Sequence, residues 1–373
     1  FFKDLNTWLS DLIWSNKRRR VALRTLFLPL TRGGLAAPDY EAYYLASQLQ
    51  WLMPWLSGTP AHEARYVWGT PERTTIIRTV VFPLKKQTVQ PLLIRTLRLC
   101  WAQYLRRRRQ GHVYASALPL WALPGLETVG IIAHRAVWHR VSIRTMGDLF
   151  DSESLLSFQD LQDLFGLPRG QFLAYSALVA TLRKLWGINV HPPDTDPVLN
   201  IILTWSPLKH RVTNLYQAIA LPSEDSLSVL RRAWEEDLAL EFTDIEWARV
   251  LEHTAKVSRN ARLKYLQFNY VQRTYLTPTR LHRMFPSVPD DCPRCAASGA
   301  DFYHMVWLCP TIVEFWRGVC EALTLLTGAP RLRMPRVCLL GFYPRSKANR
   351  YRNKLLDLAL ALARRAIAMQ WKS

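Results

Sequence analysis

Residues 292–309 have the sequence CPRCAASGADFYHMVWLC. Cys292 and Cys295 are two residues apart, so both thiolates can lie on one tight turn, and His304 and Cys309 can complete a tetrahedron of donor atoms from the other side. A Cys3His set with no open position is typical of a structural zinc site, not a catalytic one. The stretch therefore predicts one zinc ion held by these four residues, and chance clustering without a metal is the alternative.

The segment after this stretch has the pattern of a helix. Pro310 follows Cys309 directly and suits the first position of a helix, and apolar residues recur at Ile312, Trp316 and Val319. The Cys309 thiolate would then lie near the positive end of the helix dipole, which favours the charged form of the thiol.

The segment before it is basic and contains aromatic residues. Residues 259–283 hold six Lys or Arg and no acid. Such a mixture suits single strands or hairpin RNA, because cations follow phosphates and rings stack on bases. The candidate nucleic-acid-binding residues here are Arg259, Arg262, Lys264, Arg273, Tyr275 and Arg280. The alternative is a basic amphipathic helix that packs against the zinc module.

The C-terminal stretch is also strongly basic. Residues 331–372 hold eleven Lys or Arg and one acid, Asp357. Lys347, Arg350 and Arg352 precede an Ala/Leu-rich helical pattern and are predicted to contact phosphates. A calmodulin-target or membrane-surface helix is the alternative for this pattern. The apolar stretch near the end is too short and too charged to span a bilayer, so no membrane partner is expected.

Two further basic runs lie near the N-terminus. Residues 3–14 predict an amphipathic helix, and residues 91–108 predict another. The first is followed by Lys17, Arg18, Arg19 and Arg20, and the second ends in Arg106, Arg107, Arg108 and Arg109. Both runs are candidate phosphate contacts and weak candidates for nuclear import, with a solvated helix end as the alternative for the second. Between them, Thr74 to Phe82 predicts a short β-like run.

Composition sets the class of protein. The 373 residues are 49% hydrophobic, which excludes a disordered tail, and the formal net charge is +20, which favours a polyanionic partner over a chain that is basic merely for solubility. Of the six Cys only three cluster, which favours metal binding in a reducing compartment over disulfides. The strand signal is weak, so the fold class is predicted as mainly α. The predicted divisions are helical regions over 1–120 and 121–255, a basic helix with the zinc module over 256–330, and a basic helical tail over 331–373.

Several segments, in this order along the chain, resemble the C-terminal region of non-LTR retrotransposon reverse transcriptases of the long-interspersed-element type. The segments that carry the resemblance are Asp11-Leu12-Ile13-Trp14 with the basic run after it, Gly33-Gly34-Leu35, Pro38, Tyr43-Tyr44-Leu45-Ala46, Asp148-Leu149, Phe165-Gly166-Leu167-Pro168, Arg273-Thr274-Tyr275, Thr277-Pro278 and Leu281-His282. Cys292, Cys295, His304, Trp307, Cys309-Pro310 and Phe315-Trp316 resemble the zinc-binding domain of those enzymes. The chain begins with Phe1, so it is expected to be a fragment of such a polyprotein.

The resemblance implies a parent protein with an endonuclease and a polymerase that copies element RNA at a nicked target. The Tyr/Phe-x-Asp-Asp motif of the polymerase core is absent from this chain, and Asp290-Asp291, the only Asp pair, lies in a turn unsuited to a two-metal site. No catalytic residue and no small-molecule substrate are therefore expected. The implied role is to hold template RNA and target DNA for target-primed reverse transcription, in a cytoplasmic ribonucleoprotein or the nucleus, together with the rest of the polyprotein. A protein-interaction scaffold of that ribonucleoprotein is the alternative, and residual nuclease activity is a third.

Overall fold

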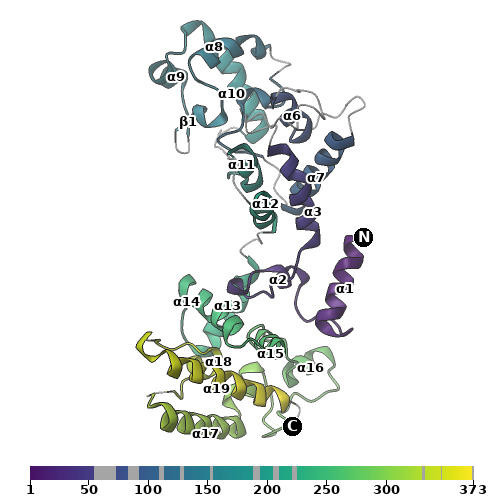
Figure 1. Ribbon diagram of the computed structural model, residues 1–373, viewed down its shortest axis with the longest axis vertical. Coiled ribbons are helices and arrows are strands. Elements are labelled where there is room, and N and C mark those ends of the chain that lie inside the picture. The colour runs from purple at the N-terminus through teal and green to yellow at the C-terminus, as the bar shows by residue number, and fades with distance from the viewer. Residues whose placement is uncertain are drawn as a thin grey trace. The chain divides into compact units, whose positions relative to one another are not determined.

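The computed structural model describes most of the chain and shows a mainly helical protein, as predicted. The described residues are 1–53, 73–82, 92–108, 113–126, 130–151, 154–187, 194–204, 210–220, 225–329, 332–345 and 347–371. They form two compact units: a terminal unit made of residues 1–38 and 222–373, and a central unit made of residues 39–221 (Figure 1).

The terminal unit contains both ends of the chain. Its elements are α1 (Phe2–Trp14), α2 (Leu23–Phe27), the 3-10 turn η1 (Leu30–Arg32), α13 (Asp225–Leu238), α14 (Asp244–Lys256), α15 (Ala261–Val271), α16 (Pro278–Met284), the π-helical turn η7 (His304–Leu308), α17 (Pro310–Thr327), α18 (Pro335–Leu340), the 3-10 turn η8 (Lys347–Asn349) and α19 (Arg350–Met369).

The N-terminal segment joins this unit by packing on α15. Trp14, at the end of α1, is buried and lies edge-on to Tyr265 with ring centroids 6.0 Å apart. Gly34 follows η1 in a tight turn, where a Cβ atom would come within 2.0 Å of the Leu28 carbonyl oxygen. The side-chain amide of Gln272, just after α15, donates to the Gly33 carbonyl at 2.7 Å. Glycine is thus required for this segment to fold back on itself.

Two helix starts in the terminal unit follow local sequence rules. Thr243 and Glu246 form a capping box at the start of α14, in which each side chain accepts from the other residue's backbone N–H. Thr277 caps α16, whose first residue is Pro278, as the Thr-Pro pair favours. These starts are encoded in a few consecutive residues, which is why periodicity and caps alone can place them.

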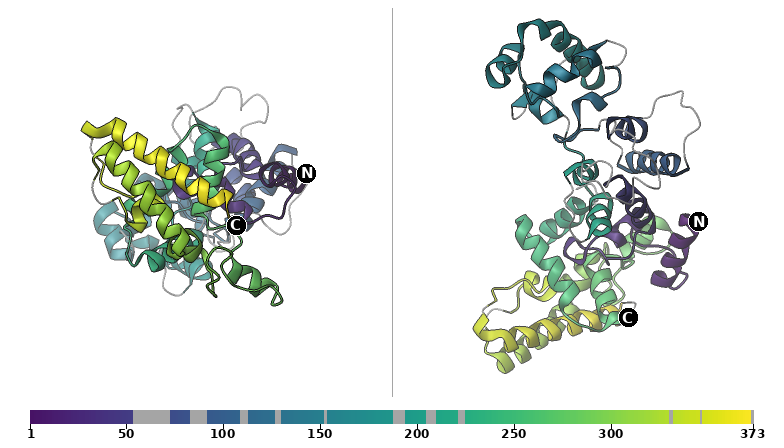
Figure 2. Two further views of the ribbon diagram at one scale, coloured as in Figure 1. Left: turned by 90° about the horizontal axis from the view of Figure 1, so that it is seen from below. Right: turned by 45° about the horizontal axis from the view of Figure 1, so that its top comes forward.

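A buried arginine joins three helices of the terminal unit. Arg364 of α19 is 2% exposed, and its Nε donates to Gln267 Oε1 of α15 at 2.8 Å. Its Nη1 donates to the carbonyls of Cys338 and Leu339 at the end of α18, at 3.1 and 3.2 Å. α17 and α19 pack side by side against this core, as both views in Figure 2 show.

The central unit is built around buried tryptophans. Its elements are α3 (Tyr40–Leu49), η2 (Gln50–Leu52), α6 (Arg73–Val80), α7 (Leu92–Arg108), η3 (Leu120–Ala122), η4 (Ile131–His134), α8 (Arg135–Arg140), η5 (Met146–Leu149), the two-residue strands β1 (Phe150–Asp151) and β2 (Ser154–Leu155), α9 (Phe158–Phe165), η6 (Arg169–Gln171), α10 (Phe172–Trp186), α11 (Pro197–Thr204) and α12 (Arg211–Ala220). β1 and β2 pair antiparallel. Trp121 and Trp138 are buried with ring centroids 5.9 Å apart, so these rings serve as core anchors, not as stacking platforms.

The predicted β-like run at Thr74 to Phe82 is wrong, because residues 73–80 form the helix α6. Ile76, Ile77 and Val80 are buried on one face of α6, which packs against α7. Strand propensity of β-branched residues is a weak preference, and burial of a helical stripe outweighs it here.

The two units do not share boundaries with the predicted divisions at 120/121, 255/256 and 330/331. The chain leaves the terminal unit after residue 38 and returns at residue 222. Residues on both sides of 330/331 belong to one core, which includes Cys292, Cys309, Val337 and Leu360. Among the described residues, no helix is long and apolar enough to cross a membrane.

Candidate metal centre and nucleic-acid interface

The two cysteines nearest in sequence lie on a hydrogen-bonded turn. The Cys292 N–H donates to the Ala297 carbonyl, and the Ala296 N–H donates back to the Cys292 carbonyl, both at 2.8 Å. Ala296 has a φ of 59°, in the left-handed region. This tight reversal places the thiols of Cys292 and Cys295 on one side of the turn, as the two-residue spacing predicts.

His304 and Cys309 reach the same point from a π-helical turn. The Cys309 N–H donates to the His304 carbonyl at 3.0 Å, which closes η7. Cys309 then becomes the N-cap of α17, where the N–H groups of Ile312 and Val313 both donate to its carbonyl at 2.8 Å. The indole of Trp316 donates to the Val306 carbonyl at 2.9 Å and fixes η7 against α17.

The four donor atoms have the spacing of a tetrahedral zinc site. All four lie within 4.8 Å of one another. Cys292 Sγ lies 3.9 Å from Cys309 Sγ, and Cys295 Sγ lies 3.3 Å from His304 Nε2. Zinc–ligand bonds of ~2.3 Å to sulfur and ~2.0–2.1 Å to nitrogen imply edges of about 3.8 Å between sulfurs and about 3.6 Å between sulfur and nitrogen. Three soft thiolates and one imidazole are a donor set that suits zinc.

The surroundings of the cluster favour a closed, structural site. Cys292 and Cys309 are buried, and Met305 Sδ lies 3.8 Å from Cys292 Sγ. Burial raises the pKa of the Cys292 thiol, but the backbone N–H groups of Arg294 and Cys295, together with the neighbouring thiols, lower it overall, whereas the same thiol contacts raise the pKa of Cys295. A thiol with a lowered pKa gives up its proton to a metal more readily.

Arg294 lies between the two cysteines of the turn and ties the cluster to α19. Its guanidinium donates to the Met305 carbonyl and to the Gln370 carbonyl, both at 2.8 Å. Sequence reasoning did not assign Arg294 or Met305 to the site. The position of Arg294 inside the Cys-x-x-Cys turn was the only available clue, and its partner at residue 370 could not be known from spacing.

The predicted basic residues at the start of the terminal unit lie on its surface beside α15. Lys17, Arg18, Arg19 and Arg20 are all exposed, as are Arg259, just before α15, and Arg262, in its first turn. The contact between Trp14 and Tyr265 brings the first run close to α15. Burial raises the pKa of Tyr275 to about 12, and the positive charge of Arg20 opposes this rise.

Arg273 and Tyr275 are occupied inside the terminal unit. The Arg273 guanidinium forms an ion pair with Asp237, donates to the Ala233 carbonyl at 3.0 Å, and lies over the Trp234 and Phe302 rings at 4.8 and 4.9 Å. Burial lowers the pKa of Arg273 to about 10. The structure gives this cation a role in packing.

The ring of Tyr275 packs on Trp371, with ring centroids 4.8 Å apart, and it is not an open stacking surface. Arg280 of α16 is exposed, and its Nη1 donates to the Arg273 carbonyl at 3.4 Å.

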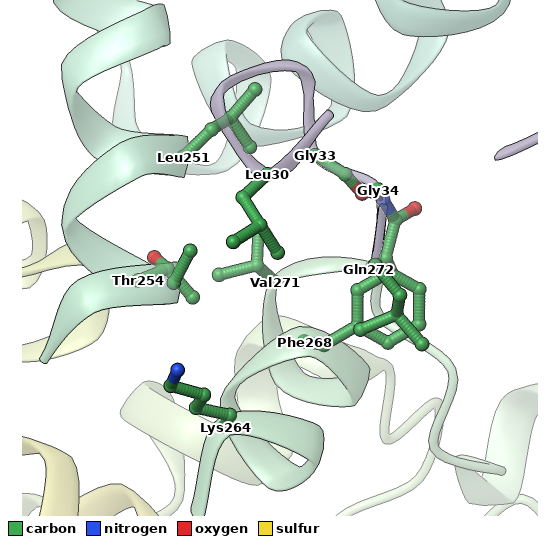
Figure 3. Close-up of a pocket in the computed structure, with 11 residues that line it drawn as sticks. Leu30, Gly33, Gly34, Leu251, Thr254, Lys264, Phe268, Val271 and Gln272 are labelled. Carbon is green, nitrogen blue, oxygen red and sulfur yellow. Dashed lines mark hydrogen bonds between the residues drawn. The ribbon is translucent and has the colours of Figure 1, made fainter. Parts of the chain in front are cut away.

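Lys264 lines an apolar cavity of about 190 Å³ between the turn at residues 30–35, α14 and α15 (Figure 3). The close-up shows Leu251, Val271 and Phe268 around this cavity and Lys264 at its edge. The side chain is half-buried, so its stem covers apolar surface while its amino group stays at the rim.

The predicted C-terminal contacts lie at the start of α19. Arg350, its first residue, is exposed, whereas Arg352 is half-buried. Both residues lie within α19 and do not precede it, contrary to the sequence interpretation. The side chain of Lys347 lies outside what the structure describes.

The basic run at the end of α7 is largely ion-paired within the central unit. Arg107 pairs with Asp39 and Arg108 pairs with Asp196, and both aspartates are buried. Asp39 caps α3 by accepting from the Ala42 N–H, and Asp196 caps α11 in the same way, so each arginine neutralises a helix cap.

Arg106 is exposed, and its Nε donates to the Ala102 carbonyl at 3.3 Å. Arg109 lies outside the described residues.

No known family model matches this chain.

Proposed function

We propose that the chain is a nucleic-acid-binding segment of a non-LTR retrotransposon reverse transcriptase, in which zinc bound by Cys292, Cys295, His304 and Cys309 stabilises the fold. In this proposal it holds template RNA and target DNA for target-primed reverse transcription and supplies no catalytic group of its own. The terminal unit provides the surface that faces nucleic acid.

The observation that supports this proposal is that exposed cations from distant parts of the sequence flank two packed segments of the terminal unit, α1 and α15. Lys17, Arg18, Arg19 and Arg20 directly follow α1, which packs on α15 through Trp14 and Tyr265. Arg259 lies just before α15, and Arg262 lies in its first turn. Exposed cations on one surface attract phosphates, and each phosphate contact releases a counterion from the nucleic acid.

A salt series tests the proposal. Fluorescence anisotropy with a single-stranded RNA of about 20 nucleotides is measured for wild type, for Arg259→Gln/Arg262→Gln, and for Arg183→Gln/Lys184→Gln. The third variant is the matched control, because Arg183 and Lys184 are exposed cations on α10 of the central unit.

We expect wild type to bind with a steep negative slope of log K against log salt, with about −0.7 per phosphate contacted. The α15 variant should lose about 1.4 of this slope if each arginine contacts one phosphate, and the control should keep the full slope. Absence of RNA and DNA binding by the zinc-loaded wild type at low salt contradicts the proposal.

A protein-interaction scaffold is the second candidate, and one feature of α19 favours it. Leu355, Leu358, Leu362 and Met369 are exposed along this helix although its opposite face is buried in the core. An apolar stripe of this kind suits a helix or groove of another protein. In the scaffold function, partner binding would change little with salt, which separates it from phosphate binding.

A further inference from the structure

A second cavity in the terminal unit, of about 590 Å³, is lined by arginines from three elements. Arg249 and His253 come from one face of α14, because residues four apart on a helix are neighbours. Arg336 comes from α18, and Arg345 from the loop that follows it. α14 and α18 are neighbours in Figure 1. None of these residues was singled out by sequence patterns.

The loop that forms one wall, residues 341–345, is held in place by specific contacts. Gly341 has a φ of +65°, and a Cβ atom there would lie 2.6 Å from His253 Nε2, so the backbone packs directly on the imidazole. The Tyr343 hydroxyl lies 2.7 Å from Asp357 Oδ1, and Arg345 donates to the same oxygen at 3.0 Å. The wall is therefore fixed before any ligand arrives, which lowers the entropic cost of binding.

The positive charge at this cavity is only partly neutralised. Glu246 also lines it, but its carboxylate accepts from the backbone N–H and the hydroxyl of Thr243, at 3.0 and 2.9 Å, as part of the α14 cap. Asp357 neutralises Arg345. Arg249 and Arg336 are exposed and form no ion pair with the carboxylates that the structure describes, although their charges help to lower the pKa of Glu246.

Two guanidiniums without carboxylate partners on different elements are suited to a group with several acceptor oxygens. A phosphoryl group offers such oxygens in a geometry that matches the guanidinium fork. Phe342 and Tyr343 also line the cavity, but their rings are already in contact with Phe242 and with the Arg345 guanidinium, so the arginines carry the recognition. The cavity is larger than one phosphate needs, which leaves room for a nucleoside.

We propose that this cavity binds a nucleotide unit, with Arg249 and Arg336 on its phosphoryl group. The ligand is either one nucleotide of a bound strand, which rests on the proposed nucleic-acid function, or a free mononucleotide. In both cases the same chemistry is recognised, and the experiment below separates the two sources.

The test uses the full, zinc-loaded chain and two double variants. Arg249→Gln/Arg336→Gln removes the proposed contacts. Arg232→Gln/Arg317→Gln removes the same charge from exposed positions on α13 and α17 of the same unit and serves as the control. Each protein is titrated with single-stranded RNA across a salt series by anisotropy, and with uridine and adenosine monophosphate by calorimetry.

If a strand nucleotide occupies the cavity, the Arg249/Arg336 variant binds RNA at least about tenfold more weakly, and its salt slope falls by about 0.7. If a free nucleotide occupies it, RNA binding is unchanged but heat from a mononucleotide is lost in this variant and kept in the control. Equal behaviour of the two variants toward both ligands overturns the proposal, even when wild type binds RNA and the proposed function stands.

Failure of the proposed function gives a different result. Wild type would not bind RNA, yet mononucleotide binding that depends on Arg249 and Arg336 would still support the cavity. Circular dichroism checks that each variant is folded. If the Gln variant is not, Arg249→Lys/Arg336→Lys keeps the charge and removes the planar fork, and unchanged binding of both ligands by this variant overturns the recognition described here.

Discussion

Removal of zinc should unfold the part of the terminal unit around the Cys3His cluster. Structural zinc contributes about 10–16 kcal/mol in zinc-finger peptides, which is as large as the whole ~5–15 kcal/mol that keeps an ordinary domain folded. Cys292 and Cys309 are 2% and 0% exposed and belong to the main core of this unit. Loss of the metal therefore leaves thiols in the core without the zinc ion that holds the Cys292–Cys295 turn, η7 and α17 together.

Substitution of one ligand gives a smaller effect that can be estimated. If the four donors share the zinc contribution about equally, Cys295→Ser costs about 2.5–4 kcal/mol. In a unit of this size that lowers Tm by roughly 5–16 °C. Cys295 is half-buried, so little of this loss comes from packing.

The matched control is Cys320→Ser, because Cys320 is a buried thiol outside the cluster, 3.6 Å from Cys338 Sγ. Zinc content is measured by mass spectrometry of the purified proteins, and Tm is measured with and without a chelator. We expect one zinc per chain and a chelator-dependent Tm in wild type and Cys320→Ser, and in Cys295→Ser a lower Tm and a more weakly bound zinc that is removed at a lower chelator concentration. A wild-type protein that contains no zinc, or whose Tm is the same after chelation, refutes the reasoning.

Three further substitutions test the packing. Arg364→Met should lower the free energy of unfolding, measured in urea, by about 3 kcal/mol, because it leaves three buried acceptors without a donor. The control is Arg365→Met at the exposed neighbouring position, which should change this free energy by less than about 0.5 kcal/mol. Equal effects of the two substitutions would contradict the buried network. Gly34→Ala should cost at least about 2 kcal/mol in the same assay, because the new Cβ would lie 2.0 Å from the Leu28 carbonyl oxygen, and a neutral result would show that this turn is not as described. Burial lowers the pKa of His253 from 6.5 to about 4, so the unfolded state binds more protons than the folded state between these pH values. The neutral His253 therefore contributes up to about 3 kcal/mol to the free energy of unfolding above pH 6.5, and this contribution is lost as pH falls through 4. His253→Gln should flatten the fall in Tm over this window, and an unchanged pH profile would mean that the imidazole is not buried in its neutral form.

The sequence by itself determined the features that depend on neighbouring residues. The spacing of Cys292, Cys295, His304 and Cys309 identified the candidate zinc cluster, because a turn and the start of a helix fix the positions of nearby donors. Helical periodicity and a weak strand signal likewise predicted a mainly helical chain. The net charge showed that cationic residues outnumber acidic ones, but it did not show which of the cationic side chains are exposed.

Only the tertiary structure decided which cations remain on the surface and which elements meet. Arg273 belongs to the same basic segment, residues 259–283, as Arg259 and Arg262, yet its guanidinium pairs with Asp237 and lies over two aromatic rings. Its partners lie tens of residues away in the chain, and no local pattern encodes such a pairing. The chain returns to the terminal unit at residue 222, and packing between buried side chains that are far apart in the sequence decides this return. Helical periodicity could not predict it, because periodicity depends only on nearby residues.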